Sequence, residues 1–330
     1  MANDQDKATE RKRLKERLSR VRRIEITAQR LVNEQLSGRY HSVFKGRGMS
    51  FDEVRPYTPG DEPRLIDWNV SARTGEVFVK RFTEERELNV LILADASLSM
   101  DFGLSAAEFR SVRGIQREEL TKQQMAAQIG AAIALSAQRN NDRVGLLVFG
   151  SDVQTFIPPR KGRQHALRVI REILEMRSAG APTDLAGALA YIGRVMKRRA
   201  AVFVLSDFLS PAFEDRLRVS VRRHDVHAFM IRDPFEQELF EQKLLRRCVL
   251  TMHDVETGEL MPVYSDKDLP GRYGAVKAAD DQGVQQVFKR LRVPFTRFST
   301  GAAYDRPLAG HFARLKDRKS TRLNSSHVSQ

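Results

Sequence analysis

From residue 87 onward, short apolar runs alternate with longer segments that have a helical hydrophobic period. The run ELNVLILAD, residues 87–95, is apolar at consecutive rather than alternate positions, which is typical of a strand covered on both faces. Similar runs predict further strands at 142–150, 200–208, 225–233 and the end of 284–299. Helical spacing predicts helices at 122–141, 162–176, 183–199, 211–224 and the start of 284–299.

This alternation indicates the fold class. Strands that alternate with helices form βα units, so we expect an α/β protein with a doubly wound, mainly parallel sheet of Rossmann type. The connections between parallel strands should be right-handed crossovers. The segment RRCVLTMHDVETGELMPV, residues 246–263, is different and predicts an inserted hairpin with Thr257 and Gly258 at its tip.

The segments that precede and follow the predicted sheet in the sequence have other patterns. Residues 1–36 are rich in basic and helix-forming residues, and residues 37–86 combine short extended pieces with Gly and Pro turn signals. The end of the chain, RKSTRLNSSHVSQ, resembles translated sequencing-adapter read-through and has neither a helix nor a strand pattern. We therefore expect a basic N-terminal helix (1–36), a small β-rich module packing on the sheet domain (37–86), the sheet domain (87–316) and a non-native tail (317–330).

Composition and charge narrow the class of protein. The 41% apolar content is sufficient for a sizeable core, and the single cysteine, Cys248, excludes an intramolecular disulfide framework. We find no apolar run long enough to span a membrane and no signal peptide, so we expect a cytoplasmic protein. The net charge is +14, but residues 1–23 carry +5 and residues 318–330 carry +3. The remaining +6 does not require a nucleic-acid partner.

Oxygen-bearing side chains follow the strand at 87–95. Asp95, Ser97 and Ser99 come at alternate positions where this strand ends, and Asp207 ends the later strand at 200–208. In doubly wound sheets, ligands bind outside the carboxyl ends of the strands. Thr183, in the loop before a helix, is expected at the same edge. Hydroxyl and carboxylate oxygens suit Mg²⁺, so the sequence predicts a cation site there.

These residues also carry a family resemblance. The pattern DASLS, followed by a threonine before a helix and an aspartate after a later strand, resembles the metal-ion-dependent adhesion site of von Willebrand factor A domains. The upstream stretch RGMSFDEVRPYTPGDEPRLIDWNVSARTGEVFVKRFTEE is similar to the signature of a bacterial family called domain of unknown function fifty-eight. The resemblance covers roughly residues 37–315. It implies that the five site residues hold Mg²⁺ or another divalent cation: Asp95, Ser97, Ser99, Thr183 and Asp207.

The resemblance further implies a function. In such domains the ion keeps an open position that a carboxylate of a protein partner fills, and two neutral hydroxyl ligands would leave the ion's charge incompletely offset. We therefore expect a non-catalytic adaptor that acts with a MoxR-type AAA+ ATPase in chaperone-like remodelling or maturation of a client. The alternative is a nucleic-acid-binding protein that uses its basic N-terminus, although a nucleic-acid partner is not favoured. A metal-dependent hydrolase ranks last, because no general base stands beside a nucleophile in the sequence.

Two other groups of residues have simpler interpretations. His224 and His227 lie where a helix turns into a strand, and we interpret them as surface histidines rather than metal ligands. The block TPGDEPRLIDWNVSAR contains charged residues and the only tryptophan of the chain: Asp61, Arg64, Asp67, Trp68 and Arg73. It could form an ion-pair network that locks the upstream module against the sheet, which we favour, or a docking surface.

Overall fold

The computed structural model describes residues 26–32, 40, 49–84, 87–101, 121–178, 182–234, 236, 248–253, 260–265 and 268–327. Within the predicted N-terminal helix, residues 26–32 are helical and the rest lies outside the described residues. The expected hairpin tip at Thr257 and Gly258 also lies outside them. The two strands of that hairpin, β8 (Cys248–His253) and β9 (Leu260–Ser265), pair antiparallel as predicted.

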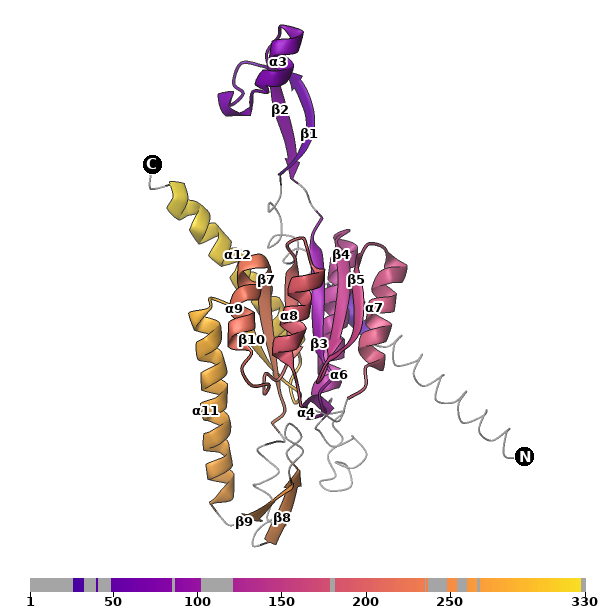
Figure 1. Cartoon of the computed structure of the whole chain (residues 1–330), viewed down its shortest axis with the longest axis vertical. Coiled ribbons are helices and arrows are strands. Elements are labelled where there is room, and N and C mark those ends of the chain that lie inside the picture. Colours follow the sequence, from indigo (N-terminus) through magenta and orange to yellow (C-terminus); the bar gives the residue numbers. More distant parts are fainter. Residues whose placement is uncertain are drawn as a thin grey trace, which may run out of the picture.

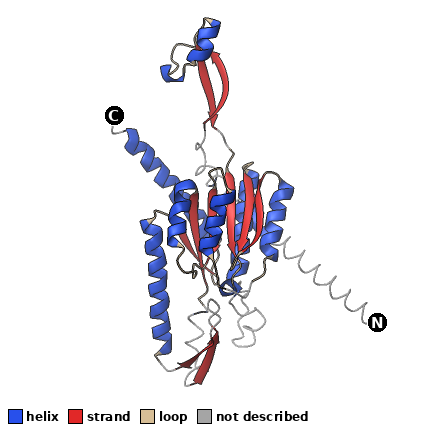
Figure 2. Cartoon of the chain, in the orientation of Figure 1, coloured by secondary structure: helices blue, strands red, loops and turns tan. Residues whose placement is uncertain are grey.

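A six-stranded, mainly parallel sheet forms the centre of the molecule (Figures 1 and 2). Its strand order is β10, β7, β6, β3, β4, β5. The strands are β3 (Asn89–Asp95), β4 (Arg143–Phe149), β5 (Val153–Arg160), β6 (Ala201–Ser206), β7 (Asp225–Arg232) and β10 (Phe295–Ser299). Neighbouring strands are parallel except β4 and β5. The predicted mixed α/β class with a mainly parallel sheet is confirmed.

The edge strand β5 is the strand that the hydrophobic pattern did not predict. It contains Pro158 and Pro159, and proline is uncommon inside strands because it cannot donate a hydrogen bond to the ladder. At the edge of the sheet, one side of the strand needs no partner, so proline is tolerated there.

Helices cover both faces of the sheet. They are α4 (Leu98–Asp101), α6 (Lys122–Arg139), α7 (Arg163–Glu175), α8 (Leu185–Val195), α9 (Glu214–Arg223), α11 (Leu269–Arg290) and α12 (Asp305–His327). Residues of α6, α7 and α12 share one hydrophobic core with Val90 and Ile92 of β3. Residues of α8, α9 and α11 share the other core with Leu91 and Leu93, because successive strand residues point to opposite faces.

The last helix corrects the prediction for the tail. We expected residues 317–330 to lack a helix, but α12 continues to His327. Leu308, Ala309 and Phe312 are buried in the core, so the first part of α12 is fixed by packing. Extending an existing helix costs much less free energy than nucleating one, and the polar tail residues can therefore continue it without apolar periodicity.

None of the helices in the described ranges is long and apolar enough to cross a membrane.

The upstream module also differs from its prediction. It is a hairpin of β1 (Met49–Pro56) and β2 (Phe78–Glu84) whose connection carries the 3-10 turn η2 (Pro63–Leu65) and the helix α3 (Trp68–Thr74). Figure 1 shows this module projecting from the sheet domain, with α3 at its far end. In its described part, residues 49–84, the module does not cover a face of the sheet, so the expected packing is not observed.

The short helix α3 lies in a stretch that we expected to be extended. The side chain of Asp67 caps it by accepting hydrogen bonds from the backbone N–H groups of Asn69 and Val70. Gly75 ends it with a φ of 77°, a conformation that favours glycine. The pattern Asp67…Gly75 is a recognisable start and stop signal, but the helix is too short to show a hydrophobic period.

Candidate metal centre

The ends of β3 and β6 bring the two predicted aspartates together. These strands are neighbours in the sheet, and Ala94 pairs with Leu205. Asp95 is the last residue of β3, and Asp207 follows Ser206, the last residue of β6. In the sheet, β3 lies between β4, the next strand along the chain, and β6, which comes later. The carboxyl end of β3 is therefore the switch point at which doubly wound sheets bind ligands. Both carboxylates are buried.

Hydrogen bonds tie Asp95 to the serines around it. One carboxylate oxygen, Oδ1, accepts a hydrogen bond from the backbone N–H of Ser97 at 2.9 Å. The other, Oδ2, accepts one from the hydroxyl of Ser206. The hydroxyls of Ser97 and Ser99 lie 2.9 Å apart, and both side chains are buried. The loop that begins at Ala96 and the short helix α4 therefore fold the alternate oxygens around one point.

The pKa values of the two buried carboxylates differ from those of exposed carboxylates. Burial, and then the nearby charge of Asp207, raise the pKa of Asp95 to about 7, although hydrogen bonds from Ser206 and Ser97 act in the opposite direction. Burial would also raise the pKa of Asp207, but the charge and hydrogen bond of Lys122 together with the charge of Arg232 outweigh it, and the pKa of Asp207 lies below its ordinary value. A hydrogen bond from Ser99 also lowers the pKa of Asp207 and links it to the serine loop.

Lys122 is a residue of this cluster that was not predicted from the sequence. Its Nζ lies 2.8 Å from Oδ2 of Asp207 and 2.5 Å from Oε1 of Glu236, and its side chain is 1% exposed. Burial would lower the pKa of Lys122, but the two carboxylates raise it above its ordinary value. A lysine before the apolar run MAAQIGAAIAL was the available signal. Ser206 was also missed, although it directly precedes Asp207.

Thr183 is buried just before α8. The backbone N–H of the next residue, Asp184, donates to the carbonyl of Gly150 at 2.7 Å, which places Thr183 beside the end of β4. Its own carbonyl accepts a hydrogen bond from the hydroxyl of Ser210 at 2.8 Å. All five predicted site residues thus lie at the same edge of the sheet. Four of them, Asp95, Ser97, Ser99 and Asp207, are joined by direct interactions.

The donor set is compatible with a hard divalent cation. Hydroxyl and carboxylate oxygens are the ligands that Mg²⁺ accepts, and a cation would favour the ionised form of Asp95, whose pKa is raised by burial and by Asp207. Across the described part of the chain, no three His, Cys, Asp or Glu side chains gather as a metal site. The cluster supplies only two carboxylates, so a cation there would depend on Ser97, Ser99 and Thr183.

The histidines correct another prediction. We expected His224 and His227 at the surface, but their exposed fractions are 2% and 4%. His227 lies in β7, where its ring stacks on Phe203, and its Nδ1 is 3.2 Å from Nε2 of His311. The other ring nitrogen of His311 lies 2.8 Å from the hydroxyl of Thr296. The rings of His227 and His311 are part of the packed core between β7, β10 and α12.

The upstream block forms ion pairs within its own module. Asp61 binds Arg55 through both guanidinium nitrogens, at 2.8 and 2.6 Å. The carboxylate of Asp67 lies 3.5 Å from Nζ of Lys80. The described ion pairs of this block stabilise the hairpin rather than lock it to the sheet, so the favoured interpretation is wrong in that respect. Trp68 is 70% exposed.

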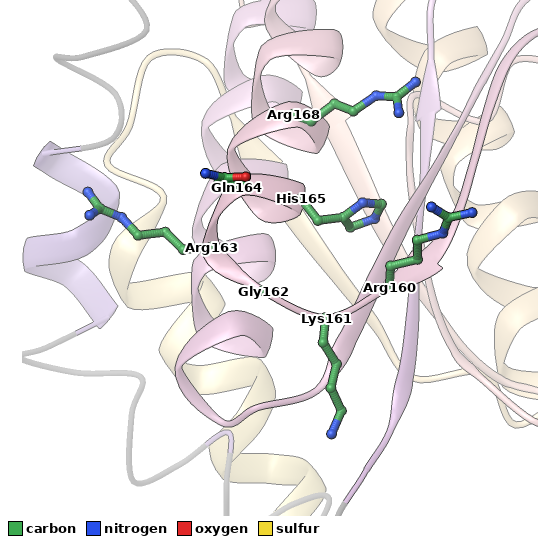
Figure 3. Close-up of a pocket in the computed structure, with 7 residues that line it drawn as sticks. All are labelled: Arg160, Lys161, Gly162, Arg163, Gln164, His165 and Arg168. Carbon is green, nitrogen blue, oxygen red and sulfur yellow. The ribbon is translucent and has the colours of Figure 1, made fainter.

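A basic pocket lies at the start of α7 (Figure 3). Its cavity of about 580 Å³ is lined by Arg160, Lys161, Gly162, Arg163, Gln164, His165 and Arg168. Nε2 of His165 lies 2.9 Å from the carbonyl of Val144, and Lys161 pairs with Glu87. The lining residues include basic side chains that point in different directions, with Lys161 and Arg163 directed away from Arg160 and Arg168 (Figure 3). The start of α7 at Gly162 carries no side-chain cap and adds the positive end of the helix dipole.

The fold and this cluster define a mixed α/β protein with a mainly parallel sheet and a buried, oxygen-rich group at its switch point. A family model described as "Protein of unknown function DUF58" matches residues 53–283, and the chain belongs to this family. The match includes the projecting module from Glu53 onward, both aspartates of the cluster, and Lys122.

Relatives share most of the chain. Uncharacterized protein Mb1516 of Mycobacterium bovis is 30% identical over 283 residues, which cover 85% of this chain and 84% of that protein. Uncharacterized protein YeaD of Bacillus subtilis is 26% identical over 167 residues, which cover 51% of this chain and 36% of that protein. Among solved structures, BatB from Bacteroides thetaiotaomicron matches 70% of this chain and 99% of its own with a TM-score of 0.40 and 13% identity. Values this low transfer no function.

Proposed function

We propose that the chain is a non-catalytic protein-interaction adaptor of von Willebrand factor A type. Five residues would hold Mg²⁺ or another divalent cation: Asp95, Ser97, Ser99, Thr183 and Asp207. The observation that supports this most is the direct linkage of Asp95, Ser97, Ser99 and Asp207 at the switch point of the sheet. The chain's membership of the DUF58 family is compatible with the proposal and assigns no activity.

The residues of the cluster would supply two kinds of ligand to the cation. Ser97 and Ser99 offer neutral hydroxyl oxygens, while Asp95 and Asp207 offer the negative charge. When bound, the cation would supply an electrophilic position for a carboxylate oxygen from the partner protein. Because the hydroxyl ligands are neutral and Asp207 is also paired with Lys122, the cluster offsets the ion's charge only in part, and an acidic side chain is the partner group that the site favours.

The partner that we propose is a MoxR-type AAA+ ATPase, with which the adaptor would remodel or mature a client protein in the cytoplasm. This step depends on the resemblance to the family of unknown function fifty-eight, which is carried by the upstream stretch at 47–85 together with DASLS.

Partner capture from lysate tests the proposal. Wild type and Asp95→Ala would each be used as bait in Mg²⁺ and in EDTA. We expect an AAA+ ATPase to be retained by wild type in Mg²⁺ and lost in the other three conditions, because Asp95 supplies one of the two carboxylates. Asp152→Ala is the matched control, since Asp152 is an exposed carboxylate near the end of β4. Equal capture in all conditions would remove the cation from the mechanism.

Nucleic-acid binding is the second candidate function. The basic pocket of Figure 3 favours anions, and its lining residues lack a carboxylate. Recovery of RNA in all four capture conditions, weakening steeply with salt and insensitive to EDTA, would support this candidate instead.

A further inference from the structure

A buried ammonium lies within the candidate metal centre. Lys122 is the first residue of α6, and a capping box between Thr121 and Gln124 fixes this end of the helix. The side chain of Lys122 enters the cluster between two acidic residues from different segments, Asp207 after β6 and Glu236 after β7. All three side chains are at most 10% exposed, so solvent screens them weakly.

Lys122 binds an atom that the cation would need. Oδ2 of Asp207 accepts from Nζ of Lys122 at 2.8 Å, while Oδ1 accepts from the backbone N–H of Leu209 at 3.3 Å. Oδ2 of Asp207 is therefore already paired with a positive charge. A divalent ion that coordinates Oδ2 has to displace the ammonium, or else lie beside it and be repelled.

Glu236 gives Lys122 a second acceptor. Its Oε1 lies 2.5 Å from Nζ of Lys122, and its Oε2 lies 3.1 Å from Nζ of Lys277 on α11. When Lys122 leaves Asp207, it can stay paired with Glu236, so no buried charge is left alone. Lys277 pairs with Oε2 of Glu236, lies over the ring of Tyr273 and has a side chain that is 27% exposed.

We propose that Lys122 is an internal cation that competes with the divalent ion for Asp207, and that Glu236 is the acceptor to which Lys122 withdraws when the ion binds. This inference rests on the proposed function, because it takes the Asp95–Asp207 cluster as the cation site. The inference makes Lys122 a regulatory residue that lowers the affinity of the cluster for the divalent ion. The ion binds only if its binding free energy exceeds the cost of displacing Lys122.

Calorimetric titration of the full chain with MgCl₂ tests the competition. Lys122→Met keeps a similar volume and removes the charge, and we expect it to bind Mg²⁺ about tenfold tighter or more. Glu236→Gln removes the acceptor for withdrawal and leaves the Lys122–Asp207 pair, so we expect binding to weaken about tenfold. Lys289→Met is the matched control, since it removes an exposed lysine charge in the last turn of α11, and we expect a change of less than about threefold.

Thermal unfolding gives a second readout. In EDTA, Lys122→Met should melt below wild type, because Asp207 and Glu236 lose their shared counter-ion. Adding MgCl₂ should then raise its melting temperature more than that of wild type, because ligand stabilisation grows with affinity. If Lys122→Met does not fold in EDTA, Glu236→Gln still tests the inference through its weaker binding.

The outcomes separate the two proposals. Equal or weaker Mg²⁺ binding by Lys122→Met, or equal or tighter binding by Glu236→Gln, would overturn the competition and make Lys122 a residue that holds Asp207 in place. If neither wild type nor any variant binds Mg²⁺, the cation site itself fails, and this inference fails with it. If wild type binds and loses binding in Asp95→Ala, the proposed site stands whatever Lys122 does.

Discussion

At the scale of the residue, Asp95 makes stability depend on pH. Its pKa is about 7 in the folded chain and about 3.9 in an unfolded one, so between these values the folded state keeps a proton that the unfolded state has released. The contribution of Asp95 to the free energy of unfolding is therefore most favourable below about pH 4. It decreases as the pH rises to about 7, by up to about 4 kcal/mol.

Asp95→Asn should remove this part of the pH dependence. In EDTA, the stability of wild type relative to Asp95→Asn should fall as the pH rises from 4.5 to 7.5, which urea unfolding at a series of pH values would measure. Saturating Mg²⁺ should oppose this fall in wild type, because a cation favours the ionised carboxylate. Asp152→Asn, which makes the same replacement at an exposed carboxylate, is the control for the substitution. Parallel curves for wild type and Asp95→Asn would show that Asp95 ionises without cost.

At the scale of the element, the start of α6 is held by a reciprocal cap. The hydroxyl of Thr121 accepts from the backbone N–H of Gln124 at 3.2 Å, and the side chain of Gln124 accepts from the N–H of Thr121 at 3.3 Å. Thr121→Ala should lower the free energy of unfolding by about 1 kcal/mol, measured by urea denaturation. Thr121→Ser keeps the hydroxyl and should recover most of this loss, whereas equal losses would show that the methyl group matters instead.

At the scale of the whole molecule, the sheet domain and the projecting module should respond differently to mutation. Leu93 is fully buried in the core under α8, so Leu93→Ala should cost about 2–5 kcal/mol. Trp68 is 70% exposed, so Trp68→Ala should change the free energy of unfolding by less than about 0.5 kcal/mol. Circular dichroism through a urea titration would measure both.

The single tryptophan offers a check on this division. Because Trp68 lies on the projecting module, its fluorescence should change little across the transition that circular dichroism detects in the sheet. A large fluorescence change that coincides with the loss of helix would mean that Trp68 is covered by the sheet domain.

Hydrophobic pattern alone was sufficient for most of the regular structure. The buried strands β3, β4, β6 and β7 and the helices α6, α7, α8 and α9 were predicted because each carries a continuous apolar run or a helical period. Only the end of α11 was predicted, and α12 was not predicted. The edge strand β5 and the helix α3 were not, because the first contains two prolines and the second has only seven residues. The helix α12 was missed over its whole length, and its polar tail continues from the packing earlier in the helix.

The sequence by itself determined that Asp95, Ser97, Ser99, Thr183 and Asp207 lie at one edge of the sheet, because parallel strands place their carboxyl ends together. Only the tertiary structure decided which other groups share that space. Lys122 of α6 pairs with Asp207 and with Glu236, and Ser206 of β6 donates to Asp95. These contacts join residues 85, 114 and 111 positions apart, and such separations give no periodic signal. Burial makes these contacts decisive, since a charge away from water must be paired, and the partner is chosen by how the elements pack.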